Sequence, residues 1–542
     1  MVINKAFFIF LFGAFFAQIL LAQENQKSKP NKQIRAAVIQ KITINNQDVF
    51  DLSITEENNA LYRMLNRIHV NTRKDVIRSQ LLFQSGDVYS KRIADETERL
   101  LRANRYLTNA DIEIIPRDAE NIDLDINTQD AWTLNPGFSF GRGGGHNKTS
   151  ISLREYNFLG SGTRIGLRYK SDIDRDSTTF QLSDNNLIGS RYNLIFDYAN
   201  NSDGNKYLFD LKKPFYSLDT RDSHGFSVAN QTSVESLYKL GAVDGQFTYS
   251  SKNLNVYKAL STGLNNGWTK RYMLGLTLDD QEYGIDSVSN PLDVNLLPDK
   301  RRHTYPHIGI EYVEDNFIEE KNLDNIGLVE DRHIGSKMHA KLGYASKNID
   351  ATSNAWFVEA GYNNSLIATP DKSLLFTSLL TGRLEENKKN NIKLKINARY
   401  DVRLSAKRLL HLEMDATIGQ NLDINNRPYL GGDNRLRGYP ARYQAGNSRI
   451  VFTVEQRYFT DWYPFRIARI GGAIFMDIGK TWDDDIFKSP QMGWLKNAGF
   501  GLRIANSRSE IGRVLHIDIA YPLDGSSDLD KLQLLIDAKK GF

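Results

Sequence analysis

The chain has 542 residues and no cysteine, and its 69 basic and 65 acidic side chains leave a formal net charge of +4. The lack of cysteine excludes disulfide frameworks, cysteine-ligated zinc and thiol catalysis, and the small net charge offers no argument for a nucleic-acid partner. The 25 Tyr, 27 Phe and 39 Gly, with a mean hydropathy of -0.46, are typical of a membrane β-barrel. A large secreted β-sandwich or propeller would share this composition.

Residues 1–22 have the layout of a secretory signal peptide. Lys5 precedes an apolar run that ends at Leu21, and the small residue Ala22 follows it. The run has the length of a signal sequence, so we expect cleavage after Ala22 rather than an uncleaved membrane anchor. No cysteine follows the run, which excludes lipoprotein anchoring. The rest of the chain holds no apolar stretch that is long enough for a helical membrane span.

Residues 23–35 are polar and are expected to form a flexible lead-in. The patterns of residues 36–130 predict a small β-α-α-β-β domain with a modest core of its own. Its predicted strands are 38–44, 110–115 and 122–127, and its predicted helices are 72–83 and 90–104. An insertion at 45–69, with a helical pattern near its end, precedes the first of these helices. The sequence leaves open whether this insertion forms a contact surface or is an addition without a function of its own.

From residue 131 to residue 542 apolar residues recur at every second position, which predicts a mainly β fold with a transmembrane antiparallel β-barrel. In the last predicted strand, residues 532–539 alternate between two faces with Leu535 as the one exception. Counting such segments gives sixteen to twenty strands, and the count is weakest over residues 223–284. The number of strands must be even, because the preceding domain and the end of the last strand are expected on the same side of the membrane.

Two segments of this region repeat one another, Asn157-Phe-Leu-Gly-Ser161 and Asn186-Leu-Ile-Gly-Ser190. Two turns that are one hairpin apart fall on the same edge of an up-and-down barrel. We therefore predict that both segments are short turns on the same side of the sheet.

The most informative stretch is the glycine-rich loop Leu430-Gly-Gly-Asp-Asn-Arg-Leu-Arg-Gly-Tyr439. Gly431, Gly432 and Gly438 offer left-handed backbone conformations, so the loop is expected to fold tightly. Its second arginine, Arg437, is the residue whose role needs an explanation.

Two carboxylates on later predicted strands are candidate partners of Arg437. In Phe475-Met-Asp-Ile-Gly479 the parity places Asp477 opposite apolar neighbours, and on the preceding strand it places Glu455 and Arg457 opposite Phe452. If the apolar faces contact lipid, both carboxylates point into the lumen, where a guanidinium would offer a bidentate partner. In the alternative interpretation, Arg437 is a solvated loop residue and Glu455 pairs with Arg457 or with water.

These motifs resemble the outer-membrane protein assembly and two-partner secretion superfamily of the BamA, TamA and FhaC type. The likeness covers nearly the whole mature chain, including an N-terminal unit that is similar to one polypeptide-transport-associated (POTRA) domain, where relatives usually carry more. It implies sixteen barrel strands and an inward-folded sixth loop in which Arg437 contacts Asp477 and Glu455. The residues that carry the resemblance are Leu436-Arg437-Gly438-Tyr439, Phe475-x-Asp477-x-Gly479, Gly499-Phe-Gly-Leu-Arg503, the terminal Phe542, Leu82-Phe83-x-x-Gly86-Asp87 and Leu100-Leu101-Arg102.

The resemblance implies a protein of the bacterial outer membrane, with its N-terminal domain in the periplasm, that inserts or translocates polypeptides. Its expected partners are unfolded outer-membrane or secreted polypeptides, outer-membrane lipid and periplasmic accessory proteins. Two alternatives stay open: a two-partner secretion transporter for one exported protein, and a passive or substrate-selective channel. No catalytic motif, cofactor site or metal-ligand cluster is found in the sequence, so an enzyme is not expected.

Overall fold

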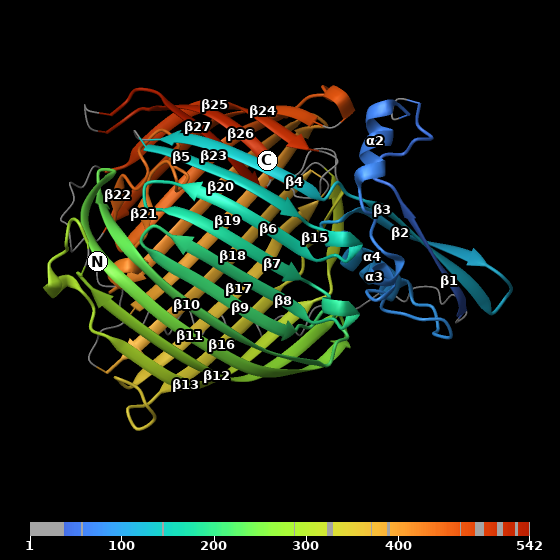
Figure 1. The fold of residues 1–542 in the computed structure, drawn as a ribbon, viewed down its shortest axis with the longest axis horizontal. Coiled ribbons are helices and arrows are strands. Elements are labelled where there is room, and N and C mark those ends of the chain that lie inside the picture. Colours follow the sequence, from blue (N-terminus) through green and yellow to red (C-terminus); the bar gives the residue numbers. More distant parts are fainter. Residues whose placement is uncertain are drawn as a thin grey trace.

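The computed structural model describes residues 37–540 except 56–57, 144–145, 287, 322–328, 370, 387–390, 467, 483–492, 507–512 and 526–528. The predicted signal peptide (1–22), the lead-in (23–35) and Phe542 lie outside the described residues. A small sheet with helices, formed by the N-terminal part of the described chain, lies at one end of a large closed barrel (Figure 1). Among the described helices, none is both long and apolar enough to cross a membrane.

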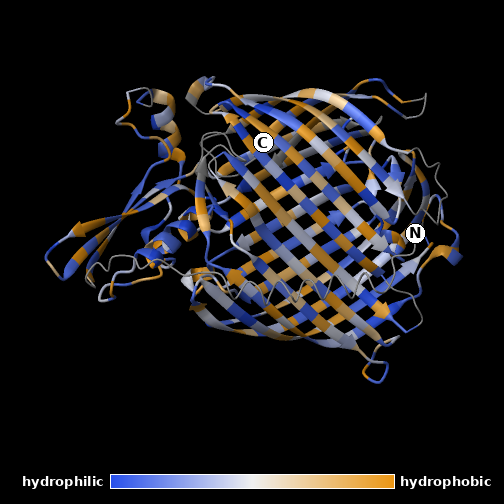
Figure 2. Ribbon diagram, turned by 180° about the vertical axis from the view of Figure 1, so that it is seen from behind, coloured by the Kyte–Doolittle hydropathy of each residue, from blue (hydrophilic) through white to orange (hydrophobic). Residues whose placement is uncertain are grey.

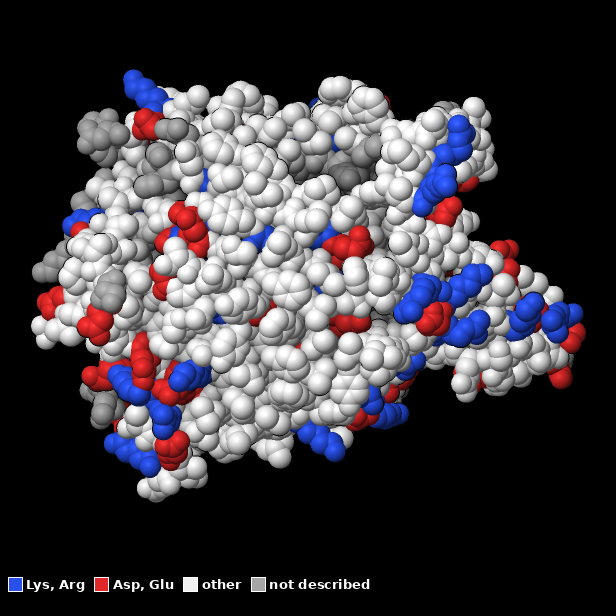
Figure 3. Space-filling view, viewed as in Figure 1, with Lys and Arg blue, Asp and Glu red and all other residues white. Residues whose placement is uncertain are grey.

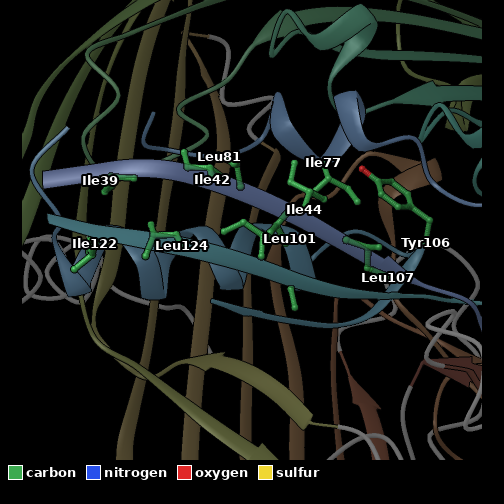
Figure 4. Packing of buried hydrophobic residues seen from close by; sticks show 12 residues of the cluster. Ile39, Ile42, Ile44, Ile77, Leu81, Leu101, Tyr106, Leu107, Ile122 and Leu124 are labelled. Atoms are coloured by element: carbon green, nitrogen blue, oxygen red, sulfur yellow. The ribbon is translucent and has the colours of Figure 1, made fainter. Parts of the chain in front are cut away.

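The N-terminal domain is a three-stranded sheet that is packed against helices. The sheet has the order β1-β3-β2, with β1 parallel and β2 antiparallel to the central β3. Alternate side chains of β1 and β3, among them Ile42, Ile44, Ile122 and Leu124, meet Leu101 of α4 in a buried apolar core (Figure 4). The elements of the domain are β1 (Val38–Gln47), α2 (Ala60–Ile68), α3 (Lys74–Arg78), α4 (Lys91–Arg102), β2 (Leu107–Pro116) and β3 (Asn121–Asp130).

The first predicted helix is shorter than the sequence pattern indicates. Helix α3 ends at Arg78 instead of continuing to residue 83. Beyond it, Leu81 turns into the core, and the chain then runs along the outer edge of β1, where the Gly86 and Tyr89 amides donate to Ile39 and Ala37. Tertiary pairing with β1 therefore overrides the helical pattern of this segment.

The barrel is closed by twenty of the described strands, in the order β10-β11-β12-β13-β16-β17-β18-β19-β20-β23-β24-β25-β26-β27-β4-β5-β6-β7-β8-β9. The sixteen strands implied by the resemblance are therefore wrong, and the upper end of the pattern count is right. The region where the count was weakest contains three long strands, β10 to β12. The strands are β4 (Leu134–Gly143), β5 (His146–Glu155), β6 (Arg164–Ser171), β7 (Asp176–Asp184), β8 (Asn193–Asn201), β9 (Gly204–Lys213), β10 (Asp222–Lys239), β11 (Ala242–Asn265), β12 (Trp268–Gly284), β13 (Arg301–Glu314), β16 (Lys337–Ala345), β17 (Ala355–Thr369), β18 (Lys372–Glu385), β19 (Asn391–Ser405), β20 (Arg408–Gln420), β23 (Ser448–Phe459), β24 (Ala468–Trp482), β25 (Leu495–Asn506), β26 (Arg513–Pro522) and β27 (Gln533–Lys540).

Apolar and polar residues alternate along the barrel strands, as the sequence predicts. Hydrophobic and hydrophilic positions follow one another along most strands of the wall (Figure 2). On β23 and β24, Phe452 and Ile474 are exposed on the outer face, whereas Glu455 and Asp477 are buried inside. Charged side chains gather toward the ends of the barrel and on the N-terminal domain, and they are sparse on the wall between (Figure 3). Such a wall is suited to contact with lipid.

We call the barrel edge beside the N-terminal domain the proximal edge and the opposite edge the distal edge. The two repeated segments lie in η1 (Phe158–Gly160) and η2 (Leu187–Gly189), and both are turns on the proximal edge, as predicted. Asn157 Nδ2 donates to Thr72 Oγ1 at 2.8 Å, and Asn186 Nδ2 donates to Ser79 Oγ at 2.7 Å. The same asparagine positions of the two turns therefore hold the N-terminal domain.

Helix α4 makes further contacts with the proximal edge. The Leu218 amide donates to Glu96 Oε1 at 2.8 Å, and Arg92 pairs with Asp219 in the same β9–β10 connection. Burial raises the pKa of the Glu96 carboxyl, although the Leu218 amide and Arg92 act in the opposite direction. The domain is thus docked on several barrel turns at once.

We predict that the double variant Asn157→Ala and Asn186→Ala loosens this docking without unfolding either body. Each lost hydrogen bond is worth about 0.5–1.5 kcal/mol, so the domain should separate from the turns more often. Limited proteolysis of the segment between residues 128 and 136 should become faster than in the wild-type chain. As a control, Ser161→Ala removes a polar group of the first turn that bonds only within that turn, and it should leave proteolysis unchanged. Equal proteolysis of all three proteins would contradict the proposed role.

Candidate functional site

The long connection between β20 and β23, residues 421–447, folds into the barrel from the distal edge. It carries two short paired strands, β21 (Tyr429–Leu430) and β22 (Gln444–Ala445). Strands β4 to β20 form the first fifteen barrel strands in chain order, so this is the eighth distal connection. The resemblance implied the sixth, and the difference arises because two additional hairpins precede the loop.

Arg437 lies at the inner end of this loop and is only 5% exposed, which contradicts the solvated alternative. Its Nε and Nη2 donate to the two oxygens of Asp477 at 2.9 Å each, which is the bidentate geometry expected of a guanidinium and a carboxylate. Its Nη1 donates to Glu455 Oε2 at 2.8 Å. The ring of Phe475 covers the guanidinium, with the central carbon 3.3 Å from the ring centroid. The structure therefore brings together the loop arginine and both carboxylates.

Three further buried charges complete the cluster around Arg437. Glu455 also accepts from Arg457 Nε at 3.0 Å, and its Oε2 lies 3.5 Å from Nη2 of Arg503. Asp518 pairs with Arg503 and lies 3.6 Å from Nη1 of Arg437. We call these six residues the charge cluster: Arg437, Arg457, Arg503, Glu455, Asp477 and Asp518. Three cations face three anions, so the cluster is neutral, as a buried set of charges must be to avoid a large desolvation penalty.

Asp477, which has no exposed surface, receives further hydrogen bonds from neighbouring strands. Thr453 Oγ1 on β23 and Asn497 Nδ2 on β25 each donate to it at 2.9 Å. These bonds orient the carboxylate toward the arginine. The strand parity placed Asp477 and Glu455 correctly in the lumen, but it did not identify Asp518 or Arg503 as members of the site, although both lie on segments with a clear alternation.

The glycines of the site serve close packing. None of Gly431, Gly432 and Gly438 has a positive φ, so the expected left-handed conformations are wrong for these positions. A β-carbon at Gly438 would lie 2.5 Å from the Cβ of Asn497, and one at Gly479 would lie 2.9 Å from Leu430 Cδ1. Side chains at these two positions would push the loop away from the wall.

Apolar side chains of the loop seal its contact with the barrel. Leu436 and Tyr439 are buried in a cluster with Leu430, Tyr443 and Leu495. The Tyr439 hydroxyl lies 2.8 Å from the carbonyl oxygen of Lys496 and 2.7 Å from that of Asp524, and it accepts from the Lys496 amide at 3.2 Å. The Leu436 to Tyr439 tetrad therefore holds the loop against β25 and the β26–β27 connection by packing as well as by charge.

Two more anchors tie the loop to other sectors of the wall. At its start, Asp423 accepts from Nη1 and Nη2 of Arg383 at 3.0 and 3.1 Å and lies 3.0 Å from Nη1 of Arg301. Near its end, Arg442 forms a bidentate pair with Asp174, in the distal turn between β6 and β7. Sequence reasoning missed these pairs, because nothing in the spacing of such distant residues signals that they meet.

A cavity remains between the loop and part of the barrel wall. This polar cavity has a volume of about 440 Å3, with Lys393, Asp415 and Arg449 among its lining residues. In the part of the chain that the structure describes, no group of His, Asp and Glu side chains is arranged to hold a metal ion. The site as seen is a mechanical anchor built from ion pairs and close packing.

Comparison with known proteins gives one family match. Residues 157–536 match the model of the Omp85 superfamily domain. No curated protein sequence matches.

Several solved structures are similar over most of the chain. BamA from Haemophilus ducreyi lacking POTRA domains 1-3 is 13% identical, with a TM-score of 0.41 and coverage of 92% of this chain and 84% of that one. CdiB from Acinetobacter baumannii is 12% identical, with a TM-score of 0.41 and coverage of 96% and 95%. CdiB from Escherichia coli is 11% identical, with a TM-score of 0.46 and coverage of 96% of each chain.

We predict that Arg437→Ala releases the inner end of the loop while the barrel stays folded. Removing one partner of a buried pair costs about 3–5 kcal/mol, because the buried carboxylate of Asp477 is left without its cation. Hydrogen exchange of amides 430–445 should accelerate, whereas exchange in β23 to β26 should not. Arg437→Lys should restore protection only in part, because an ammonium group lacks the bidentate fork.

Arg435→Ala is the matched control for this prediction. Arg435 lies two residues away in the same loop, and its side chain, which pairs with Glu413, is 42% exposed. A surface pair is worth only about 0–1 kcal/mol, so this variant should exchange nearly as slowly as the wild-type chain. If Arg437→Ala behaved like Arg435→Ala, the charge cluster would not be what holds the loop.

We predict that Asp174→Asn weakens the anchor near the end of the loop and leaves the inner end in place. Losing a charge-assisted pair with Arg442 should cost about 1.5–3 kcal/mol. Amides 440–445 should exchange faster, but amides 434–438 should stay protected by Arg437. Asp172→Asn in the same turn is the control, since Asp172 pairs with Lys170. Faster exchange over the whole loop in Asp174→Asn would mean that the anchors act as one unit.

Proposed function

The chain belongs to the Omp85 superfamily of outer-membrane proteins that insert or translocate polypeptides, and on that premise we propose that it inserts client polypeptides through the wall of its barrel. Members of this superfamily are transporters and assembly factors, and we propose that this chain works without a catalytic centre. Its clients would be unfolded outer-membrane or secreted polypeptides, with periplasmic accessory proteins and outer-membrane lipid as further partners.

The observation that carries this proposal is the loop across the lumen. Residues 421–447 are tied to β24 through Arg437, to β13 and β18 through Asp423, and to the β6–β7 turn through Arg442. A loop that is held on three sectors of the wall obstructs a straight path along the barrel axis. This supports a client route through the wall over a passive channel, whose lumen would stay open.

The seam between the first and last barrel strands is the place in the wall where insertion would occur. β4 and β27 are neighbours in the closed barrel, and they are the two ends of the barrel-forming chain. Separation of these strands would expose two edges whose backbone groups can pair with an incoming strand. We propose that this seam opens toward the membrane and that clients leave through it as paired strands.

The N-terminal domain, which we place in the periplasm, would receive the client first. One edge of its sheet is covered, because residues 86–89 run along β1. At the other edge, β2 has two central backbone groups occupied by α4: the Ile112 amide donates to Glu98 Oε1 at 2.7 Å, and Arg102 Nη1 donates to the Ala110 carbonyl at 3.0 Å. Beyond Ile112 the edge is exposed, with Ile114 and Ile115 in contact with solvent.

Arg102 also ties this edge to the barrel. Its guanidinium donates to both oxygens of Asp331 at 2.8 Å and to Glu319 at 2.8 Å, and both acids belong to the hairpin of β14 (Phe317–Lys321) and β15 (Val329–His333). Although burial alone would lower the pKa of Arg102, these carboxylates raise it above its usual range. We propose that a client strand first pairs with β2 at Ile114. Pairing then extends along β2 as the α4 side chains Glu98 and Arg102 release its backbone groups.

We predict that Ile114→Pro blocks delivery of the client while the domain stays folded. Backbone groups alternate along a strand between its two sides. Because the Ile112 amide faces away from β3, the Ile114 amide does too. Proline removes that donor without removing a bond to β3. In reconstituted vesicles, insertion of an unfolded outer-membrane client should slow markedly in Ile114→Pro. Ile114→Ala keeps the amide and should insert at the wild-type rate. A wild-type rate in Ile114→Pro would overturn pairing at this edge.

A further inference from the structure

Helix α2 belongs to the insertion whose role the sequence left open. It has nine residues, and the Asn59 side chain caps it by accepting from the amides of Leu61 and Tyr62 at 3.0 and 3.1 Å. Helices of this length are marginal in water on their own. The helix therefore depends on what its faces contact.

One face of α2 is docked on the N-terminal domain. Tyr62 is buried and stacks on Phe50, with ring centroids 4.6 Å apart. Asn66 exchanges hydrogen bonds with the Phe50 backbone, accepting from its amide at 3.1 Å and donating to its carbonyl at 2.8 Å. These contacts fix the rotation of the helix, so its other two faces are presented in a defined direction.

A second face of α2 is apolar and exposed. Leu61, Met64 and Ile68 follow the i, i+3, i+7 spacing of a single helix face and are 48%, 53% and 60% exposed. Arg63 and Arg67 lie on a third face, roughly 110° around the helix axis from this one, and basic side chains are seen at the surface of α2 (Figure 3). We call Leu61, Met64 and Ile68 the apolar face of α2. A short helix with an exposed apolar face and a basic face has the character of a helix that lies in a membrane surface.

The position of α2 also fits a helix that lies in a membrane surface. It lies beside the proximal edge of the barrel (Figure 1), and the Tyr62 hydroxyl donates to the Phe465 carbonyl in the β23–β24 turn at 2.6 Å. In that turn Phe465 is 81% and Trp462 is 65% exposed. Exposed aromatic residues at the end of a lipid-facing wall are typical of the membrane interface. Helix α2 therefore lies beside the end of the surface that the barrel presents to lipid.

We propose that α2 is an interfacial helix whose apolar face enters the headgroup region of the outer membrane's periplasmic leaflet beside the β23–β24 turn. Arg63 and Arg67 then remain at the level of the headgroups, where they favour anionic phospholipid. The partner is lipid and not a protein, because the helix is joined to a turn that already carries interfacial aromatic residues. This contact would hold the N-terminal domain at a set height below the membrane, independently of any client.

The chain contains no cysteine, so single-cysteine variants allow a direct test in the full-length protein. Met64→Cys places a bimane label on the apolar face, and Arg63→Cys places the same label one residue away on the basic face. Both proteins are reconstituted in vesicles of phosphatidylethanolamine and phosphatidylglycerol that carry a nitroxide at a shallow acyl-chain position. Interfacial helices bury their apolar face about 5–10 Å deep, so this quencher should reach a label at position 64. The quencher is present in both leaflets, so the orientation of the barrel does not affect the result.

The expected result is loss of fluorescence from the label at position 64 and little loss from the label at position 63. If the label at 64 is not quenched by the lipid nitroxide but is quenched by aqueous iodide, the apolar face lies in water and the proposal is wrong. If neither quencher reaches the label at 64, a protein surface covers the helix, which also overturns the proposal. Equal quenching of both labels would show that the helix does not lie as proposed. None of these results depends on client insertion, so the outcome is independent of the proposed function.

Discussion

The inward position of the long loop depends on the contact of Arg437 with Asp477 and Glu455. A guanidinium in the interior of a barrel is tolerated only if carboxylates neutralise it, and those carboxylates in turn need their cation. Arg457, Arg503 and Asp518 complete a neutral set that spans the four strands β23 to β26 in addition to the loop. These pairs stabilise the inward position of the loop on this side of the lumen, and its glycines and Tyr439 pack closely in that position.

The size of the barrel explains why one anchor is not enough. The diameter of a barrel grows with its number of strands, and twenty described strands enclose a wider lumen than the sixteen that the resemblance implied. A loop held only at Arg437 would leave the opposite wall out of reach. Asp423 and Arg442 extend its attachment to β13, β18 and the β6–β7 turn. Arg442 contacts the β6–β7 turn, which lies on the β4 side of the seam, and Arg437 contacts β24, which lies on the β27 side. Inside the lumen, the loop therefore connects the parts of the wall on both sides of the seam.

The N-terminal domain is positioned by the barrel turns and not by its own linker alone. Asn157 and Asn186 hold α3 and its surroundings, the β9–β10 connection holds α4, and the β14–β15 hairpin holds Arg102. These contacts bring the β2 edge close to the proximal opening. They also place α2 at the rim, where Tyr62 contacts the β23–β24 turn that carries the exposed Trp462 and Phe465.

The class of fold, the inward direction of Glu455 and Asp477 and the shared edge of the two repeated turns could be predicted from the sequence alone. These follow from local periodicity and from the order of the hairpins along the chain. The contact of Arg437 with the two carboxylates was left open by the residue pattern and was implied only by the family resemblance. The strand number, the early end of α3 and the anchors at Asp423 and Arg442 were decided only by the tertiary structure. Single barrel strands are weak signals, and α3 stops because the chain must run along β1. Asp174 and Arg442 are 268 residues apart in the sequence. Closure of the barrel brings them together, and no local sequence pattern predicts this contact.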